Sequence, residues 1–242
     1  SELKVLKAHP ALSRRLEPQA VEDYFALGYI PEPKTIYRDV YKLRPGHTLL
    51  VERGKPLPAQ HEYWDVPFTP VAVGSERDLC DEVFARLREA VEIRLVAEVP
   101  LGAFLSGGVD SSAVVAAMAQ LQNDPVNTCA IGFDVPQFNE TDFARQVAQR
   151  YNTNHFERIV ASDDFDLLDT LGALYDEPYA DSSAIPTYRV CQLARERVTV
   201  ALSGDGGDEN FAGYRRYRWH MNEERLRGAL PLGLRKPLFG AL

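Results

Sequence analysis

The chain has 242 residues, a length that fits one α/β core or one domain with part of another. Its hydrophobic content of 45% and charged content of 26% are ordinary for a soluble globular protein. The net charge of −8 argues against a nucleic-acid partner, which usually needs a basic face. No apolar run approaches the roughly 20 residues that span a bilayer, and the polar start predicts neither a signal peptide nor a membrane partner.

The composition of the chain changes along its length. Nine of the 16 prolines lie in the first 70 residues, and we place a domain boundary near Pro67 to Gly74, which gives domains of residues 1–66 and 67–242. In the first domain, Pro18 to Gly28 predicts a short helix and Thr48 to Glu52 predicts a strand. Because residues 1–66 carry little apolar mass, we expect them to pack loosely on the second domain or on another chain.

The second domain shows a regular alternation of helix and strand patterns. Ser75 is a suitable N-cap for a helix over residues 77–96. A short apolar run predicts a strand at 101–105, and further strands are predicted at 128–133, 156–160 and 198–202. Helical patterns cover 110–122, 141–151, 164–175 and 184–196. This alternation predicts an α/β fold with a parallel sheet and helices on both faces.

The three cysteines are far apart and show neither C-x-x-C nor zinc-ligand spacing; they are Cys80, Cys129 and Cys191. We therefore expect reduced, buried thiols in a cytoplasmic protein.

A glycine- and serine-rich run joins the strand at 101–105 to the helix at 110–122. It reads Leu105-Ser106-Gly107-Gly108-Val109-Asp110-Ser111-Ser112. Ligands of open α/β sheets lie at the carboxyl ends of strands, and the free N–H groups of a helix N-terminus attract anions. Asp110 suits Mg²⁺ held against phosphates. The alternative is a structural turn with a serine cap.

A second glycine-rich loop, from Ser203 to Tyr214, follows the strand at 198–202 and carries Asp205, Asp208 and Glu209. If both strands belong to one parallel sheet, both loops lie at the same edge. Two carboxylate-bearing loops around one polyphosphate indicate shared Mg²⁺ ligation. The alternative is a flexible loop with solvated acids.

The first run, S-G-G-V-D-S, resembles the PP-loop of ATP pyrophosphatases, which have an adenine-nucleotide α-hydrolase-like fold. The pair of loops resembles S-G-G-(L/V)-D-S-S and S-G-x-G-x-D-E-x-F-x-G-Y of the glutamine-dependent asparagine synthetase family. This resemblance extends over residues 67–220. Leu43 to His47 and Tyr63 to Asp65 also resemble the last strands of the family's glutaminase domain and the following linker. The resemblance identifies residues 1–66 as a remnant of that domain, and 67–242 as a synthetase domain shortened at its C-terminus.

The resemblance implies a ligase that uses ATP and Mg²⁺ to adenylate aspartate, releases pyrophosphate, and amidates the adenylate with ammonia from glutamine. The residues implied to hold pyrophosphate are Ser106, Gly107, Gly108, Asp110, Ser111 and Ser112. Those implied to hold adenosine are Leu105, Ile131, Ser203 and Gly204. Asp110 and Asp208 would bind Mg²⁺. Asp205 stands where the family usually has the glutamate near the ammonia attack.

Two departures from the family pattern bear on the substrates. In the run Glu177 to Ser183, Ser182 occupies about the place of an arginine that helps to bind aspartate, so the acceptor is aspartate or another carboxylate. Asp181 and Ser182 alternatively cap a helix that begins at Ala184. No cysteine precedes Cys80, so we expect no glutaminase activity. Two alternatives to an asparagine synthetase are another PP-loop enzyme and a non-catalytic module. For the oligomeric state, we expect a monomer or a homodimer.

Overall fold

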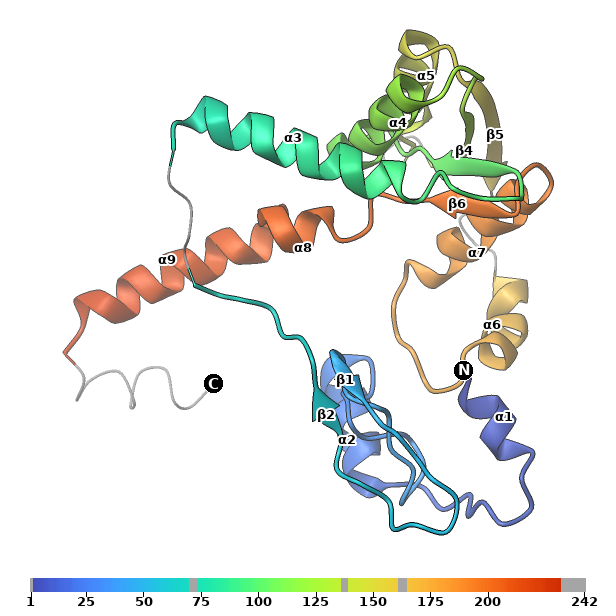
Figure 1. Ribbon diagram of the computed structural model, residues 1–242, viewed down its shortest axis with the longest axis vertical. Coiled ribbons are helices and arrows are strands. Elements are labelled where there is room, and N and C mark those ends of the chain that lie inside the picture. The colour runs from blue at the N-terminus through green and yellow to red at the C-terminus, as the bar shows by residue number, and fades with distance from the viewer. Residues whose placement is uncertain (1, 70–73, 136–138, 161–164, 232–242) are drawn as a thin grey trace. The chain divides into compact units, whose positions relative to one another are not determined.

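The computed structural model describes residues 2–69, 74–135, 139–160 and 165–231 (Figure 1). The chain forms two compact units. Unit 1 contains Ser1–Cys80 and Val160–Arg189, and unit 2 contains Asp81–Ile159 and Val190–Leu242. Among the described residues, none of the helices has the length and apolar character needed to cross a membrane.

Unit 2 is built on a four-stranded sheet with the order β5–β4–β3–β6. The strands are β3 Leu101–Phe104, β4 Asn127–Phe133, β5 Asn154–Val160 and β6 Val200–Leu202. Strand β3 is parallel to both of its neighbours, and Ala103 lies opposite Thr128 on one side and Leu202 on the other. The prediction of a parallel α/β sheet is confirmed, with strand ends that differ from the expected ones by up to two residues.

Helices cover both faces of this sheet. Successive residues of a strand point to opposite faces, so neighbouring residues of one strand pack against different helices. The helices are α3 Glu76–Glu92, α4 Val109–Leu121, α5 Thr141–Arg150 and α7 Ala184–Arg195. Ala103 and Leu105 pack in a cluster with α3, α4 and α5. Phe104 and Cys129 pack in a second cluster with Leu193 of α7.

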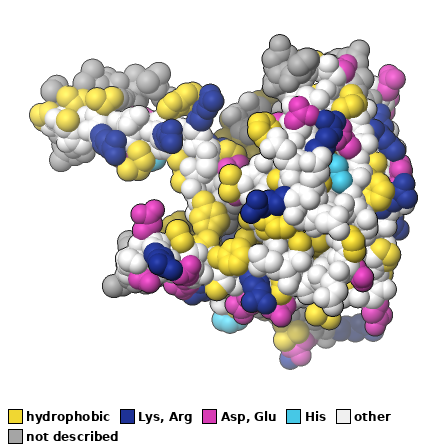
Figure 2. All heavy atoms as spheres, turned by 90° about the horizontal axis from the view of Figure 1, so that it is seen from above, with side chains coloured by type: hydrophobic (Ala, Val, Ile, Leu, Met, Phe, Trp, Pro, Cys, Tyr) yellow, Lys and Arg dark blue, Asp and Glu magenta, His cyan; other side chains and the backbone are white. Residues whose placement is uncertain are grey.

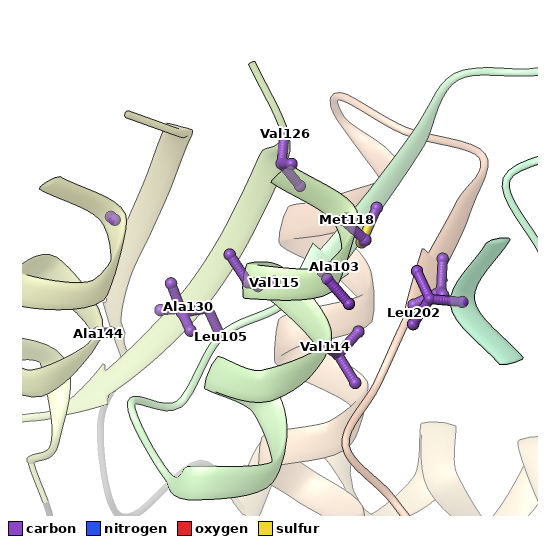
Figure 3. Close-up of a cluster of buried hydrophobic side chains, with 12 residues drawn as sticks. Ala103, Leu105, Val114, Val115, Met118, Val126, Ala130, Ala144 and Leu202 are labelled. Carbon is purple, nitrogen blue, oxygen red and sulfur yellow. The ribbon is translucent and has the colours of Figure 1, made fainter. Parts of the chain in front are cut away.

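The larger core lies between α4 and the strands. Figure 3 shows Val115 and Met118 of α4 among side chains of the sheet, including Ala103 and Leu202. Val115 and Met118 are fully buried. Burial of a side chain of this size contributes about 1.5–3 kcal/mol, so α4 is held firmly at the carboxyl end of β3.

Unit 1 consists of short elements with small hydrophobic clusters. They are α1 Leu3–Lys7, α2 Pro18–Leu27, β1 His47–Thr48, β2 His61–Glu62, the 3₁₀ turn Phe165–Leu167 and α6 Leu168–Leu174. Pro18 begins α2, and Gly28, with a left-handed φ of 82°, ends it by donating its N–H to the Tyr24 carbonyl. The predicted helix at 18–28 is therefore confirmed.

Residues 3–42 of unit 1 are tied to the segment that follows α6. The Asp176 carboxylate accepts the N–H groups of Leu3 (2.5 Å) and Lys4 (3.1 Å). The Glu177 carboxylate accepts the N–H of Ile36 at 2.6 Å and pairs with Lys42. These long-range bonds join two parts of the sequence that we had assigned to different domains.

The rest of the N-terminal segment is exposed. Every residue from 48 to 69 is solvent-exposed. The strand expected at Thr48–Glu52 is wrong beyond Thr48, because β1 consists of His47 and Thr48, which pair with Glu62 and His61. Leu50 and Val51 are exposed, and within the described ranges no strand pairs with them. On the face that Figure 2 displays, hydrophobic side chains likewise stand at the surface among charged ones.

Three further expectations need correction. The helix expected at 77–96 ends at Glu92, where the chain tightens into i→i+3 bonds such as Leu95 N–H to the Glu92 carbonyl. The helix expected at 164–175 begins with a 3₁₀ turn, and its first residue, 164, lies outside the described residues. Cys80 and Cys191 are exposed rather than buried, and Cys80 lies on the half of α3 without buried side chains.

Candidate functional site

The first loop leaves β3 at Leu105 and is held in shape by its own serines. The Leu105 N–H donates to the Cys129 carbonyl at 2.9 Å, which fixes the start of the loop to β4. The Ser111 hydroxyl accepts the N–H of Ser106 (3.3 Å) and lies 3.0 Å from its hydroxyl. The Gly108 N–H donates to Ser106 Oγ at 3.2 Å. Ser111 is buried, so its side chain shapes the loop from inside.

Gly107 lies against the first turn of α5. Its φ of +85° is in the left-handed region, where a residue with a side chain is strained. A Cβ at this position would lie 2.5 Å from Phe143 Cβ and 2.6 Å from the Ala144 nitrogen. The loop therefore needs glycine for both its conformation and its close approach to α5.

Helix α4 begins directly after this loop with an uncapped N-terminus. Its N-cap residue, Gly108, has an extended conformation and provides no side-chain hydrogen bond to the first turn. The first N–H groups of a helix lack intrahelical partners, and the helix dipole adds partial positive charge. Loop and helix start thus have the chemistry of an anion-binding cradle.

The second loop, which follows β6, is in direct contact with the first. A Cβ on Gly204 would lie 2.7 Å from the Ser111 nitrogen and 2.9 Å from Asp110 Cβ. A Cβ on Gly207 would meet the Asp110 carboxylate, 2.6 Å from Oδ2 and 2.7 Å from Oδ1. The structure thus brings the two loops together at one place, with backbone of the second loop packed on Asp110.

The residues proposed to hold adenosine follow three neighbouring strands. Leu105 follows β3, Ile131 lies near the end of β4, and Ser203 and Gly204 follow β6. Leu105 is buried, whereas the others are half-buried. Asp205 is exposed, and its carboxylate accepts a hydrogen bond from the Ser203 hydroxyl at 3.1 Å. These residues therefore lie along the same edge of the sheet as the anion cradle.

Asp208 lies in a short helix that the sequence did not predict. Helix α8, Gly207–Phe211, starts after Gly206, whose φ is +92°. Asp208 and Glu209 occupy its first turn, where the dipole favours negative charge. Part of this loop therefore forms a helix, which the alternative interpretation of a flexible loop did not predict, and α9 Arg215–Ala229 follows.

A tyrosine after α8 bonds back to the helix. The Tyr214 hydroxyl donates to Glu209 Oε1 at 2.6 Å, and the Arg216 guanidinium lies 4.4 Å from the centre of the Tyr214 ring. The hydrogen bond to Glu209 is the main reason that the pKa of Tyr214 rises to about 12. The same bond lowers the pKa of Glu209. The phenol therefore remains a hydrogen-bond donor throughout the neutral pH range.

The carboxylates of the two loops suit a magnesium ion that is also bound by phosphates better than a metal ion bound by protein ligands alone. In the described part of the chain, no group of three or more His, Cys, Asp or Glu residues is placed to bind a metal. Mg²⁺ is commonly held by one or two carboxylates together with substrate phosphates. Asp110 and Asp208 are both half-buried, and Gly207, the residue before Asp208, packs on the Asp110 carboxylate, so their residue types and placement fit such an ion.

The stretch expected to receive the acceptor lies in unit 1. Asp181 Oδ1 accepts the Ser183 N–H at 2.8 Å just before α7, and this bond lowers the pKa of the Asp181 carboxyl. The bonded N–H lies in the turn before the helix, so the alternative of Asp181 as the N-cap of α7 stays a prediction. A cavity of about 720 Å³ lies beside this stretch. Its lining includes Tyr24, Tyr37, Tyr175, Tyr179, Lys7, Asp176, Glu177, Asp181 and Ser182.

Some contacts of the site were not accessible from the sequence. Phe143 and Ala144 back the first loop, although they lie far from it along the chain. Gly207 packs on Asp110, and only the glycine itself signalled a close approach. Acidic residues are typical of the first turn of a helix, so Asp208 and Glu209 could have indicated α8. The glycines before them favoured the prediction of a loop instead.

A parallel sheet whose strand ends carry an anion cradle and an adjoining acidic loop defines an α/β protein with a polyphosphate-type binding edge. Residues 82–241 match the asparagine synthase family, and residues 1–64 match the glutamine amidotransferase domain. Since the first match covers most of the chain, this protein belongs to the asparagine synthase family.

The relatives that the chain resembles agree with this assignment. A provisionally named glutamine-hydrolysing asparagine synthetase 2 of Methanocaldococcus jannaschii is 39% identical over 231 residues, which is 93% of this chain and 44% of that protein. Glutamine-hydrolysing asparagine synthetase 1 of Bacillus subtilis is 31% identical over 224 residues, 92% of this chain and 35% of that protein. The chain thus spans less than half the length of these relatives.

Among solved structures, the NH3-dependent NAD synthetase of Campylobacter jejuni is similar with a TM-score of 0.38 and 12% identity, over 55% of this chain and 60% of that one.

Proposed function

We propose that this chain carries the ATP-dependent synthetase part of a glutamine-dependent asparagine synthetase. In this reaction a side-chain carboxylate oxygen of aspartate attacks the α-phosphorus of ATP and pyrophosphate leaves. Ammonia then attacks the acyl carbon of the adenylate and AMP leaves with the carboxylate oxygen. The observation that carries the proposal is the contact of Gly204 and Gly207 with Asp110, which joins the two loops into one site. Membership of the asparagine synthase family supports it.

The nucleotide would lie along the edge formed by β4, β3 and β6. Backbone groups of Leu105, Ile131, Ser203 and Gly204 would hold the adenosine part. The pyrophosphate part would lie on Ser106, Gly107, Gly108 and Ser112, against the uncapped start of α4. Because the Ser111 hydroxyl is engaged within the loop, Ser111 would act by shaping the cradle. Glycines at 107 and 108 leave the backbone open to the phosphate oxygens.

Asp110 and Asp208 would bind Mg²⁺ together with the phosphates. When bound, Mg²⁺ neutralises the phosphate charge and so stabilises the pyrophosphate leaving group. Asp110 enters from the first turn of α4 and Asp208 from the first turn of α8. Each carboxylate is thereby carried by a helix, a more rigid support than a free loop.

Asp205 is our candidate for the amidation step. It lies next to Ser203 and Gly204 and is exposed, so an incoming ammonia can reach it. A carboxylate there would orient ammonia by accepting its hydrogens and would take the proton that is released on amide formation. Its hydrogen bond from Ser203 at 3.1 Å orients the carboxylate relative to the adenosine end of the site.

A different carboxylate acceptor is the second candidate function, and one observation favours it. Ser182 stands where an arginine would bind the aspartate carboxylate, and a serine hydroxyl cannot form the bidentate, charge-assisted pair that an arginine forms. An acceptor without that second carboxylate would therefore suit this chain better.

The organisation of the whole protein follows the same proposal. Residues 1–66 would belong with a glutaminase half that supplies ammonia, and residues 67–242 with the synthetase half. We propose a protein of the cytoplasm that acts on small molecules, without nucleic-acid or membrane partners. A homodimer is compatible with this organisation.

Product analysis tests the function. The protein is incubated with Mg-ATP and ammonium, with and without aspartate, and AMP and pyrophosphate are measured. The proposal predicts AMP and pyrophosphate in equal amounts, dependent on aspartate. If a panel of other carboxylates replaces aspartate, the second candidate holds. ADP and phosphate as products, or no turnover with any carboxylate, would refute adenylation. Asp110→Asn is the matched inactive control.

A further inference from the structure

The carboxylate of Asp208 is packed on a glycine that comes five residues later in the chain. A Cβ on Gly213 would overlap with Asp208 Oδ1 and would lie 2.8 Å from its Cγ and 3.2 Å from its Cα. Atoms this close cannot coexist with a side chain at position 213 unless the carboxylate moves. Gly213 itself is exposed, so burial in a core does not explain the absence of a side chain.

The backbone conformation of Gly213 does not explain it either. The glycines with left-handed φ include Gly107 and Gly206, and Gly213 is not among them. An alanine would therefore fit the local backbone without strain. What glycine provides at position 213 is the room that the Asp208 carboxylate occupies.

A short clasp holds Gly213 in this place. Ala212 ends α8 in the left-handed conformation, with a φ of 55°. The Gly213 N–H donates to the Asp208 carbonyl at 3.0 Å, and the Tyr214 hydroxyl donates to Glu209 Oε1 at 2.6 Å. The chain thus folds back on the first turn of α8, and these two hydrogen bonds hold the contact between Gly213 and the Asp208 carboxylate.

The other proposed Mg²⁺ ligand has an equivalent support. The Asp110 carboxylate lies against Gly207, which also has no left-handed φ. One segment, 207–213, therefore supplies a glycine to each of the two carboxylates. Fixing both from the same short segment would hold their relative orientation even though they come from different loops.

We propose that Gly213, held by the Tyr214–Glu209 hydrogen bond, is a positioning residue that fixes the Asp208 carboxylate for Mg²⁺. The inference rests on the proposed function, because it concerns the metal of the same nucleotide site. Groups behind a metal ligand restrict its rotamers, and their loss typically costs about 10- to 100-fold in metal affinity. A methyl group at position 213 would turn the carboxylate away, and loss of the tyrosine hydroxyl would loosen its support.

The experiment measures metal binding directly. Mn²⁺ replaces Mg²⁺ and is followed by electron paramagnetic resonance in the presence of α,β-methylene-ATP, which cannot release pyrophosphate. Nucleotide affinity is measured separately in EDTA by calorimetry, and folding by thermal unfolding. The variants are Gly213→Ala and Tyr214→Phe. Gly228→Ala is the matched control, because a Cβ at this α9 position meets nothing within 4 Å.

We expect Gly213→Ala to weaken Mn²⁺ binding by about 10- to 100-fold, with unchanged nucleotide affinity in EDTA and an unchanged unfolding temperature. Tyr214→Phe should weaken it by less, and Gly228→Ala not at all. Wild-type Mn²⁺ affinity in Gly213→Ala would overturn the inference and leave the proposed function in place. An equal loss of nucleotide affinity in EDTA would also overturn it, because the glycine would then serve the loop in general. If the wild-type protein binds no nucleotide under either condition, both the function and the inference fail.

Discussion

Substitution of Gly204 by alanine probes the contact that joins the two loops. The added Cβ would lie 2.7 Å from the Ser111 nitrogen, where ordinary contact begins at 3.4 Å, so the neighbours must separate by 3.4 − 2.7 = 0.7 Å. The nearest atoms belong to the backbone of α4 and to Asp110 Cβ, which cannot swing aside as the end of a long side chain would. α4 is itself fixed in the core by Met118 and Val115.

Overpacking of this kind costs about 1–3 kcal/mol. If the cost falls on the shape of the site, nucleotide affinity drops by about 5- to 150-fold, since about 1.4 kcal/mol is a factor of ten. The assay is calorimetric titration with Mg²⁺ and α,β-methylene-ATP, alongside urea unfolding. Gly228→Ala is the control, and it should keep its affinity and gain up to about 1 kcal/mol of helix stability.

The result that would refute this reasoning is wild-type affinity in Gly204→Ala with wild-type stability. The loops would then be far enough apart to admit a methyl group, and the packing on Asp110 would not be part of the site. A loss of stability alone, with unchanged affinity, would show that the contact supports the fold without shaping the nucleotide site.

The remaining predictions concern the carboxylates, the core and pH. Asp110→Asn and Asp208→Asn should each abolish the Mg²⁺-dependent gain in nucleotide affinity, and the double variant should lose no more than either one; additive losses in titration would contradict a shared ion. Met118→Ala should lower the free energy of unfolding in urea by about 2–5 kcal/mol, whereas the exposed Met221→Ala should change it by less than about 0.5 kcal/mol. Burial lowers the pKa of His155, so its folded pKa lies below its unfolded one. The unfolded state then binds the proton first, and the melting temperature should fall as the pH drops below about 6.5, the unperturbed histidine pKa; His155→Asn should flatten this decline, and an unchanged slope would refute the assignment.

The sheet and its helices were predictable because their signals are local. Four short strand patterns, each followed or preceded by a helical pattern, correspond to β3, β4, β5 and β6. The apolar run of β3 implies burial on both faces, which the alternation of Ala103 and Phe104 between two clusters confirms. The capping of α3 by Ser75 was also predictable, and its hydroxyl does accept the Asp78 N–H at 3.2 Å.

What the sequence could not supply depends on contacts between distant residues. The run at Thr48–Glu52 has strand-forming residues, but a strand needs a partner, and beyond Thr48 none is paired with it. Glu177 belongs to the run expected to receive the acceptor, yet its carboxylate accepts the N–H of Ile36. The spacing of apolar residues in a sequence indicates whether a segment forms a helix or a strand. It does not indicate which distant residues that segment contacts.

Within the site, residue types were readable but their packing was not. Glycines at 204 and 213 were visible as motif positions, Gly207 was visible only as a further glycine of the loop, and a loop explanation sufficed for all three. Only the three-dimensional structure separates Gly206, which needs its left-handed φ, from Gly213, which needs the space beside Asp208. The close approaches follow from how β6 and α4 are stacked in the fold, a three-dimensional property.

The most direct test of the central claim, that the two loops form one adenylation site, is isotope transfer. Aspartate labelled with ¹⁸O in its side-chain carboxylate is supplied with Mg-ATP and ammonium, and the AMP is examined by mass spectrometry. The account predicts that each AMP carries one ¹⁸O, because the carboxylate oxygen that attacks the α-phosphorus stays with it when ammonia displaces AMP. AMP without label, formed at the same rate with and without the acceptor, would show that water attacks the nucleotide and would contradict the account.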